Sequence, residues 1–248
     1  MIPLELKNPS MTRCLIFDAD DTLWDNNHYF EQAIDEFLEL IAPVACDRAG
    51  VRSLLCEVEK ECIPQGGYGT RNFLHALRQT FQRLYTGRDG MEFFAAIEQI
   101  GERLLNHPIQ PRPGVTVTLE ALRESHRLLL FTKGDPEEQS GKVARSGLKD
   151  HFAAVEIAPE KDVAAYQELI VRHRLDPAHT FMVGNSPRSD VLPALEAGLW
   201  AVFIPHPHTW ELEQEEVSPH PRLLRIESIR ELPALLQYHS PVVPATFA

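Results

Sequence analysis

Two aspartates at the end of an apolar run have the spacing of a catalytic pair. The run Leu15-Ile16-Phe17 leads directly into Asp18-Ala19-Asp20-Asp21-Thr22. Such a run, closed by acids, is typical of a buried parallel strand that ends in a polar loop, where α/β sheets bind their ligands. Residues two apart in an extended chain point the same way, so one carboxylate can attack while the other transfers a proton. We predict that Asp18 and Asp20 are this pair and that Asp21 is either solvated or part of a turn.

Five apolar runs are predicted to form the strands that position these aspartates, at residues 14–18, 127–132, 154–158, 180–184 and 200–205, with a weaker sixth at 223–226. Helical patterns separate most of them, at residues 115–125, 136–146, 164–174 and 190–197. Asp135 and Pro136 are typical of a helix start, and Gly147 is typical of a helix end. Alternating strands and helices predict an α/β fold with a Rossmann-like, doubly wound parallel sheet.

The interval between the first two strands has a different pattern. From residue 26 to residue 107, apolar residues recur at helical spacing in four segments, without a strand pattern. This length exceeds what one crossover connection needs, so we predict an inserted all-helical domain. The predicted domains are a core of residues 11–25 and 108–237, the helical domain of residues 26–107, and peripheral tails of residues 1–10 and 238–248. Met11 is an alternative start, and the predicted hinges are residues 25–27 and 107–113.

The motifs resemble those of the haloacid dehalogenase-like (HAD) superfamily of phosphoryl-transfer enzymes, over residues 12–205. The segment from Asp18 to Thr22 matches the family's D-x-D-x-T signature; Thr132, Lys161 and the segment from Gly184 to Asp190 follow in the order of its other three motifs. The resemblance implies that Asp18 forms an aspartyl-phosphate, and that Asp20 protonates the leaving alkoxide and then activates water. It also implies that the helical insertion is a cap that closes over the active site and selects the substrate.

Four further residues are predicted to act on the phosphoryl group: Thr132, Lys133, Gly134 and Lys161. Thr132 can donate its hydroxyl to a phosphoryl oxygen, and Gly134 after Lys133 lets backbone N–H groups approach an anion. The alternative is that Lys133-Gly134 only turns the chain into the next helix. Lys161 stands at the start of a helical segment, an unfavourable place for a cation unless it neutralises a phosphoryl group. A solvated surface lysine is the alternative for this position.

A magnesium ion is implied by the same resemblance. Asp190, the Asp18 carboxylate and the Asp20 backbone carbonyl would supply the oxygen ligands that Mg²⁺ prefers. Asn185 stands where many family members carry a second acid, and its side-chain carbonyl can coordinate or hydrogen-bond. The family often has Lys-Pro where this chain has Lys161-Asp162, which leaves the positive charge in place. The alternative for Asp190 is the N-cap of the next helix.

Within the predicted cap, the segment from Gly66 to Arg71 contains three glycines, one aromatic residue and one cation. We predict that this loop contacts the substrate and that Arg71 binds it; a plain interhelical turn is the alternative. Elsewhere, His206 and His208 stand between prolines and are predicted to lie in a surface loop.

Composition narrows the classes of partner. The formal net charge of −12 argues against a nucleic-acid partner, which needs clustered Lys and Arg. No apolar stretch long enough to span a membrane and no secretory signal is visible. The four cysteines have neither a C-x-x-C pair nor zinc-finger spacing, so we expect reduced thiols and a cytoplasmic protein. The sequence leaves the oligomeric state open.

The predicted function is Mg²⁺-dependent hydrolysis of a small phosphorylated metabolite by a phosphatase. A phosphomutase of the same fold differs in whether the cap excludes water. L-2-haloacid dehalogenases need no metal and lack an acid two residues after the nucleophile, so Asp20 argues against them. A non-enzymatic phospho-accepting regulatory domain also combines strand-end acids with Thr and Lys, but it lacks the D-x-D spacing and a large helical insertion.

Overall fold

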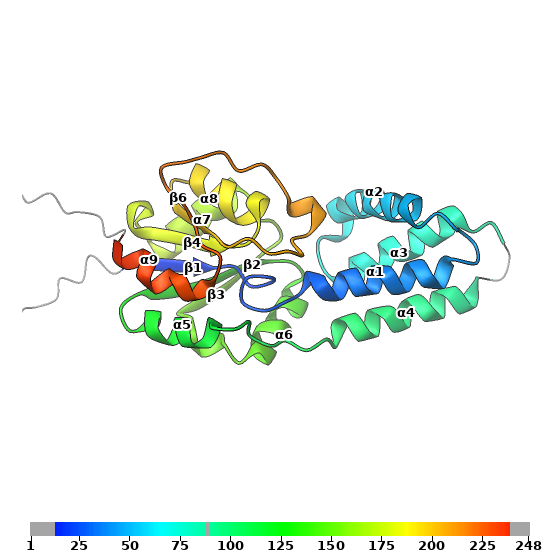
Figure 1. Ribbon diagram of the computed structural model, residues 1–248, viewed down its shortest axis with the longest axis horizontal. Coiled ribbons are helices and arrows are strands. Elements are labelled where there is room, and N and C mark those ends of the chain that lie inside the picture. The colour runs from blue at the N-terminus through cyan, green and yellow to red at the C-terminus, as the bar shows by residue number, and fades with distance from the viewer. Residues whose placement is uncertain (1–12, 88–89, 239–248) are drawn as a thin grey trace, which may run out of the picture.

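A six-stranded parallel sheet forms the core of the computed structural model, which describes residues 13–87 and 90–238 (Figure 1). The strand order is β3-β2-β1-β4-β5-β6, and the bounds are β1 (Cys14–Phe17), β2 (Arg127–Lys133), β3 (Ala154–Ala158), β4 (Thr180–Gly184), β5 (Trp200–Phe203) and β6 (Leu223–Arg225). Each predicted run therefore contains one strand, and the α/β class is confirmed. The predicted tail 1–10, the alternative start at Met11 and all of the predicted tail 238–248 except Tyr238 lie outside the described residues.

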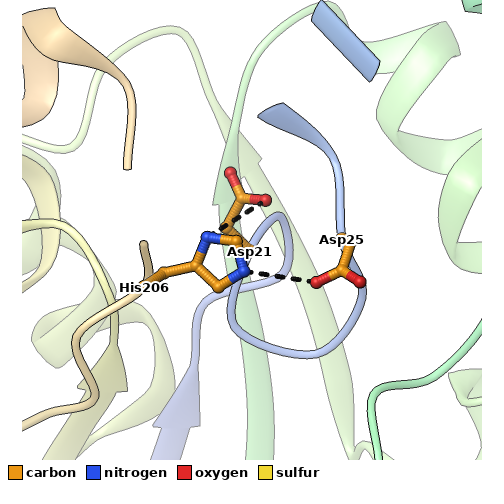
Figure 2. Close-up of side chains that lie close together, drawn as sticks. All are labelled: Asp21, Asp25 and His206. Atoms are coloured by element: carbon orange, nitrogen blue, oxygen red, sulfur yellow. Dashed lines mark hydrogen bonds and ion pairs between the residues drawn. The ribbon is translucent and has the colours of Figure 1, made fainter. Parts of the chain in front are cut away.

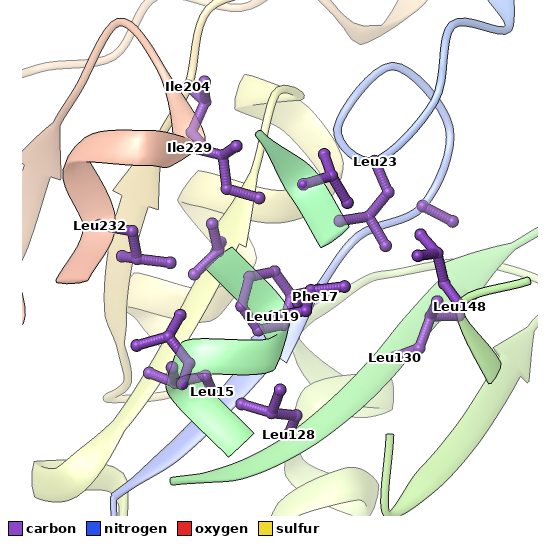
Figure 3. Packing of buried hydrophobic residues seen from close by; sticks show 14 of the residues in the cluster. Leu15, Phe17, Leu23, Leu119, Leu128, Leu130, Leu148, Ile204, Ile229 and Leu232 are labelled. Carbon is purple, nitrogen blue, oxygen red and sulfur yellow. The ribbon is translucent and has the colours of Figure 1, made fainter. Parts of the chain in front are cut away.

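Helices cover both faces of the sheet because successive residues of each strand point to opposite sides. Leu15 and Phe17 of β1 pack with α5 (Val115–Arg123), α6 (Pro136–Ser146) and α9 (Leu232–Tyr238). Figure 3 shows Phe17 beside Leu119 of α5, in the same cluster as Leu232 of α9. Cys14 and Ile16 pack on the other face with α7 (Val163–His173) and α8 (Leu192–Glu196). The sheet is therefore doubly wound, as predicted.

Four helices are inserted between β1 and β2 and form a separate lobe, at the right of Figure 1. They are α1 (Asn27–Ile41), α2 (Arg48–Gly66), α3 (Thr70–Leu84) and α4 (Met91–Leu105). Helix α1 packs against α2 and α4, and α3 packs against the same two helices, around a hydrophobic cluster of their own. This confirms the helical insertion, while the domain bounds at residues 26 and 107 stay a prediction.

The two connections between the lobes lie side by side. Trp24 and Pro111 form an antiparallel bridge, and the Arg112 N–H donates to the Leu23 carbonyl at 2.8 Å. Trp24 is fully buried, so the entry and exit segments of the insertion are held at one point beside β1. Over residues 13–87 and 90–238, no helix has the length and apolarity needed to cross a membrane.

Neighbouring leucines of α4 allow a matched test of the helical lobe. Leu104 is 3% exposed and packs in its cluster, whereas Leu105 is 45% exposed. We expect Leu104→Ala to lower the free energy of unfolding by about 2–5 kcal/mol, because it leaves a cavity. Leu105→Ala should change it by less than about 1 kcal/mol. Urea unfolding of both variants measures the difference; equal losses would contradict the described packing.

Candidate active site

The carboxyl ends of β1, β2 and β4 meet where the strand order reverses direction. From β1 the chain adds β2 and β3 on one side and β4 on the other, and such a point is where open α/β sheets bind ligands. A cavity opens there between the core and the helical lobe. Of the nine residues predicted for the site, the structure brings eight to its walls: Asp18, Asp20, Thr132, Lys133, Gly134, Lys161, Asn185 and Asp190.

Lys161 lies between two acids at the floor of this cavity. Its Nζ is 2.9 Å from Asp18 Oδ1, donates to Asp190 Oδ1 as well, and lies 3.2 Å from the Phe131 carbonyl oxygen. Lys161 is 2% exposed, so the alternative of a solvated surface lysine is wrong. The lysine also lies before α7 rather than inside its first turn, because Asp162 is the N-cap and accepts the Ala165 N–H.

Burial and charge change the acid–base properties of this group of three. Burial, and then repulsion from Asp190, raise the pKa of Asp18 to about 7 against the attraction of Lys161. Burial alone would lower the pKa of Lys161, but the two carboxylates raise it well above its ordinary value. One buried cation therefore faces two acids, and the site has spare negative charge that a bound cation would stabilise.

A widened helical turn places Asp190 at the end of β4. The expected helix at 190–197 starts earlier, as a π-helical turn at Pro187–Val191 that continues into α8. Ser186 is the N-cap, and its backbone N–H donates to Asp190 Oδ2 at 2.8 Å. The alternative of Asp190 as N-cap is therefore wrong. Gly184 ends β4 directly beneath, where a Cβ would collide with the Asp190 carboxylate.

Asp20 is held by three donors, none of which the sequence analysis predicted. Trp24 Nε1 donates to Asp20 Oδ1 at 2.8 Å, and Lys142 Nζ and Gln139 Nε2 donate to Oδ2 at 3.0 and 3.2 Å. Gln139 also donates to Thr132 Oγ1 at 2.6 Å, which links the two predicted residues. Gln139 and Lys142 are three residues apart on one face of α6, beside the buried Val143; this spacing was the available signal.

Thr22 joins the ends of β1 and β4. Its Oγ1 lies 2.9 Å from Asp18 Oδ2 and 3.1 Å from Asn185 Oδ1, so one hydroxyl hydrogen is shared between two acceptors. The Asn185 amide in turn donates to Thr209 Oγ1 at 3.2 Å. The side-chain carbonyl of Asn185 is thus turned toward Asp18.

Lys133 and Gly134 reach the cavity but are already engaged by the protein. Lys133 Nζ is 2.5 Å from Glu213 Oε1 and 3.3 Å from Glu160 Oε1, and lies 4.0 Å from the centre of the Tyr68 ring. The Gly134 N–H donates to the Ala158 carbonyl at 3.1 Å, so it is not free to bind an anion. Gly134 has a φ of 137°, which suits a glycine at this turn.

Arg71 is the one predicted residue that the structure does not bring to the cavity. It is exposed on the first turn of α3, whereas Gly67, Tyr68 and Gly69 of the same segment do line the walls. Tyr68 donates to Glu160 Oε2 at 2.6 Å, and Thr70 donates to Glu138 from its backbone and its hydroxyl. The segment therefore joins the helical lobe to the core.

A second cluster of metal-binding residue types joins two loops: Figure 2 shows Asp21 and Asp25, from the loop after β1, beside His206, from the loop after β5. His206 Nε2 is 3.2 Å from Asp25 Oδ1, and its Nδ1 is 3.8 Å from Asp21 Oδ1. Asp21 is 6% exposed and its carboxylate accepts the N–H groups of Asn26 and Asn27. Asp21 does lie in a turn, as one of its two interpretations held, but it is buried and not solvated. His206 lies in a loop as predicted, but it is buried and not at the surface.

The comparisons with known proteins agree with the fold and the motifs. The family model of haloacid dehalogenase-like hydrolases matches residues 12–198. The rat N-acylneuraminate-9-phosphatase is 27% identical, with 92% of this chain and 95% of the rat protein covered. A glyceraldehyde 3-phosphate phosphatase of Methanothermobacter thermautotrophicus is 26% identical, with 84% and 92% covered. A solved haloacid dehalogenase-like family hydrolase from Xanthomonas campestris has a TM-score of 0.81 at 26% identity and 93% coverage of each chain. The chain belongs to the haloacid dehalogenase-like hydrolase family.

The close approach of Gly184 to Asp190 gives a test of the site geometry. We expect Gly184→Ala to displace the Asp190 carboxylate from Lys161 and to lower the free energy of unfolding by about 1–3 kcal/mol, as overpacking does. Gly141→Ala is the matched control, because a Cβ on this helical glycine meets nothing within 4 Å. It should be neutral or stabilise by about 0.5–1 kcal/mol. Urea unfolding and a crystal structure of Gly184→Ala measure both effects; an undisplaced Asp190 would refute the described contact.

Proposed function

We propose that this protein is a Mg²⁺-dependent phosphatase that hydrolyses a small phosphorylated metabolite through an aspartyl-phosphate on Asp18. The observation that carries the proposal is the buried group of Asp18, Lys161 and Asp190 at the floor of one cavity. Relatives named as phosphatases support the reaction class, and their names give different phosphorylated substrates.

The first half-reaction uses Asp18 as nucleophile. A carboxylate oxygen forms a bond to phosphorus while the bond from phosphorus to the alkoxide oxygen breaks, and Asp20 gives its proton to that oxygen. Lys161 and the hydroxyl of Thr132 neutralise and orient the phosphoryl oxygens. Thr132 suits this role because its oxygen accepts from Gln139, which leaves the hydroxyl hydrogen to be donated.

The second half-reaction returns Asp18 to its carboxylate form. Water attacks the phosphorus of the aspartyl-phosphate, Asp20 takes the proton of that water, and inorganic phosphate leaves. Asp20 is held in one orientation by Trp24, Gln139 and Lys142, so the same carboxyl group is in position for both proton transfers. A 2-haloacid dehalogenase needs no such second acid, and this arrangement favours the phosphatase.

The donor set fits a magnesium ion. Asp18 and Asp190 are carboxylates with spare negative charge; Asn185 Oδ1 and the Asp20 backbone carbonyl would complete a set of hard oxygen ligands. When bound, the ion would neutralise charge on the phosphoryl group. The cluster of Asp21, Asp25 and His206 fits less well, because the Asp21 carboxylate already holds two backbone N–H groups.

The proposed setting is the cytoplasm. All four cysteines, Cys14, Cys46, Cys56 and Cys62, are free thiols, and two of them are buried. Unpaired thiols fit a reducing compartment better than an oxidising one.

Loss of the nucleophile tests the reaction. The protein should hydrolyse p-nitrophenyl phosphate with Mg²⁺ and lose this activity in EDTA. Asp18→Asn should fold normally and lower kcat by at least about 1,000-fold, since the acyl-phosphate can no longer form. Asp150→Asn is the control and should keep full activity, because Asp150 is exposed on the surface of the α/β domain. Wild-type turnover by Asp18→Asn would remove Asp18 from the reaction.

Metal binding should depend on pH because Asp18 must lose a proton to coordinate the ion. Burial and the neighbouring Asp190 raise its pKa to about 7. Mg²⁺ affinity should therefore fall by up to about tenfold for each pH unit below 7 and level off above it. Calorimetry at pH 6 in buffers of different ionisation enthalpy measures the proton released. Asp18→Asn should bind more weakly and release none; a pH-independent wild-type affinity would contradict the assignment of Asp18 as a ligand.

A further inference from the structure

The helical lobe lines the upper part of the cavity with one side of each of three helices. Asn27, Phe30 and Ile34 follow one face of α1, and Asn72, Phe73 and Ala76 follow α3. On α2 the lining residues are Glu59 and Ile63, spaced four apart, and Gly67 follows the helix end. Each of these three rows of lining residues starts next to the core and runs away from it along its helix. Most of the side chains are apolar, and we call this part of the cavity the sleeve.

Glu59 is the one ionisable side chain that these three helices contribute to the described cavity walls. It precedes the α2 end at Gly66 by two helical turns, which is roughly 10 Å along the axis. Among the described residues, none donates a hydrogen bond to its carboxylate or forms an ion pair with it. The nearby Arg52 is instead paired with Glu31, at 2.6 Å.

None of the cations on the described cavity walls is available to attract an anion to this sleeve. The cations on the described walls are Lys133, Lys142 and Lys161, all from the core. Each one already contacts carboxylates of the protein, at Glu213, Asp20 and Asp18 respectively. If the end of the substrate far from the phosphate carried a carboxylate, that carboxylate would lie near Glu59 and would be repelled, with no free cation on these walls to compensate.

Burial and neighbouring carboxylates act together on the carboxyl group of Glu59. Burial, and then the carboxylate of Glu31, raise its pKa to about 7; Arg52 opposes this shift and Glu211 adds to it. A cation beside the carboxylate would stabilise its ionised form, and an apolar sleeve strengthens such a pair by excluding water.

We propose that Glu59 forms a subsite for a positively charged amino group, so that the substrate is a phosphate monoester whose other end carries an ammonium ion. This inference rests on the proposed phosphatase function and narrows its substrate class. The apolar residues that line the sleeve would contact the carbon chain between the two charged ends: Phe30, Ile34, Ile63, Phe73 and Ala76.

Three series of synthetic esters test the subsite: ω-aminoalkyl, n-alkyl and ω-carboxyalkyl phosphates, matched in length from four to eight carbons. At the best length we expect kcat/KM to be about tenfold higher for the amino ester than for the alkyl ester, and lowest for the carboxy ester. Glu59→Gln should bring the amino ester to within about twofold of the alkyl ester, through KM. Glu59→Lys should favour the carboxy ester. Glu57→Gln, at an exposed position of the same helix, should keep the wild-type order.

An unchanged amino preference in Glu59→Gln, or equal use of the three series by the wild type, overturns the subsite. p-Nitrophenyl phosphate separates this result from a failure of the phosphatase proposal. If that ester is hydrolysed and the three series are used alike, the phosphatase stands and the subsite falls. If it is not hydrolysed, but calorimetry finds binding of the amino ester that Glu59→Gln abolishes, the subsite stands and the phosphatase proposal falls.

Discussion

The ion pairs of one buried lysine with two aspartates are the interaction on which the arrangement of the site depends. Lys161 comes from the segment before α7, Asp18 from the end of β1 and Asp190 from the turn after β4, so one ammonium group joins three parts of the core. Removing one partner of a buried pair costs about 3–5 kcal/mol, because the other charge is left unpaired. The same burial that makes the pairing necessary leaves Asp18 with a raised pKa. The exclusion of water around these like charges therefore explains both the ion pairs of Lys161 and the raised pKa of Asp18.

A second set of polar contacts joins the helical lobe to that core. Helix α6 is central to it: Glu138 accepts from Thr70 of the lobe, while Gln139 and Lys142 hold Asp20. Lys142 is also 3.5 Å from Glu138, so it contacts both the acceptor of the lobe contact and Asp20. The position of the lobe and the orientation of Asp20 are therefore coupled through adjacent residues of one helix.

The main elements and most of the site followed from local patterns. Apolar runs closed by polar residues predicted every strand, and Asp135, Pro136 and Gly147 predicted the bounds of α6, because capping depends on residues close in sequence. The fold class and the helical insertion were confirmed in this way. The start of the helix around Asp190 was missed because a π-helical turn has no simple apolar period, and it is stabilised by the Ser186 cap and the Asp190 side chain.

By itself, the sequence determined which residues have the chemistry for the site and at which strand ends they stand, since alternation and capping act over a few residues. Only the tertiary structure decided which of them meet. Arg71 faces solvent, although it follows a loop that lines the cavity, and Glu59, an ordinary acid on a helix by pattern, lines the sleeve without a partner. Lys142 donates a hydrogen bond to Asp20, which stands 122 positions earlier in the sequence. Such contacts depend on how helices pack around the sheet, and helix periodicity alone leaves that packing undetermined.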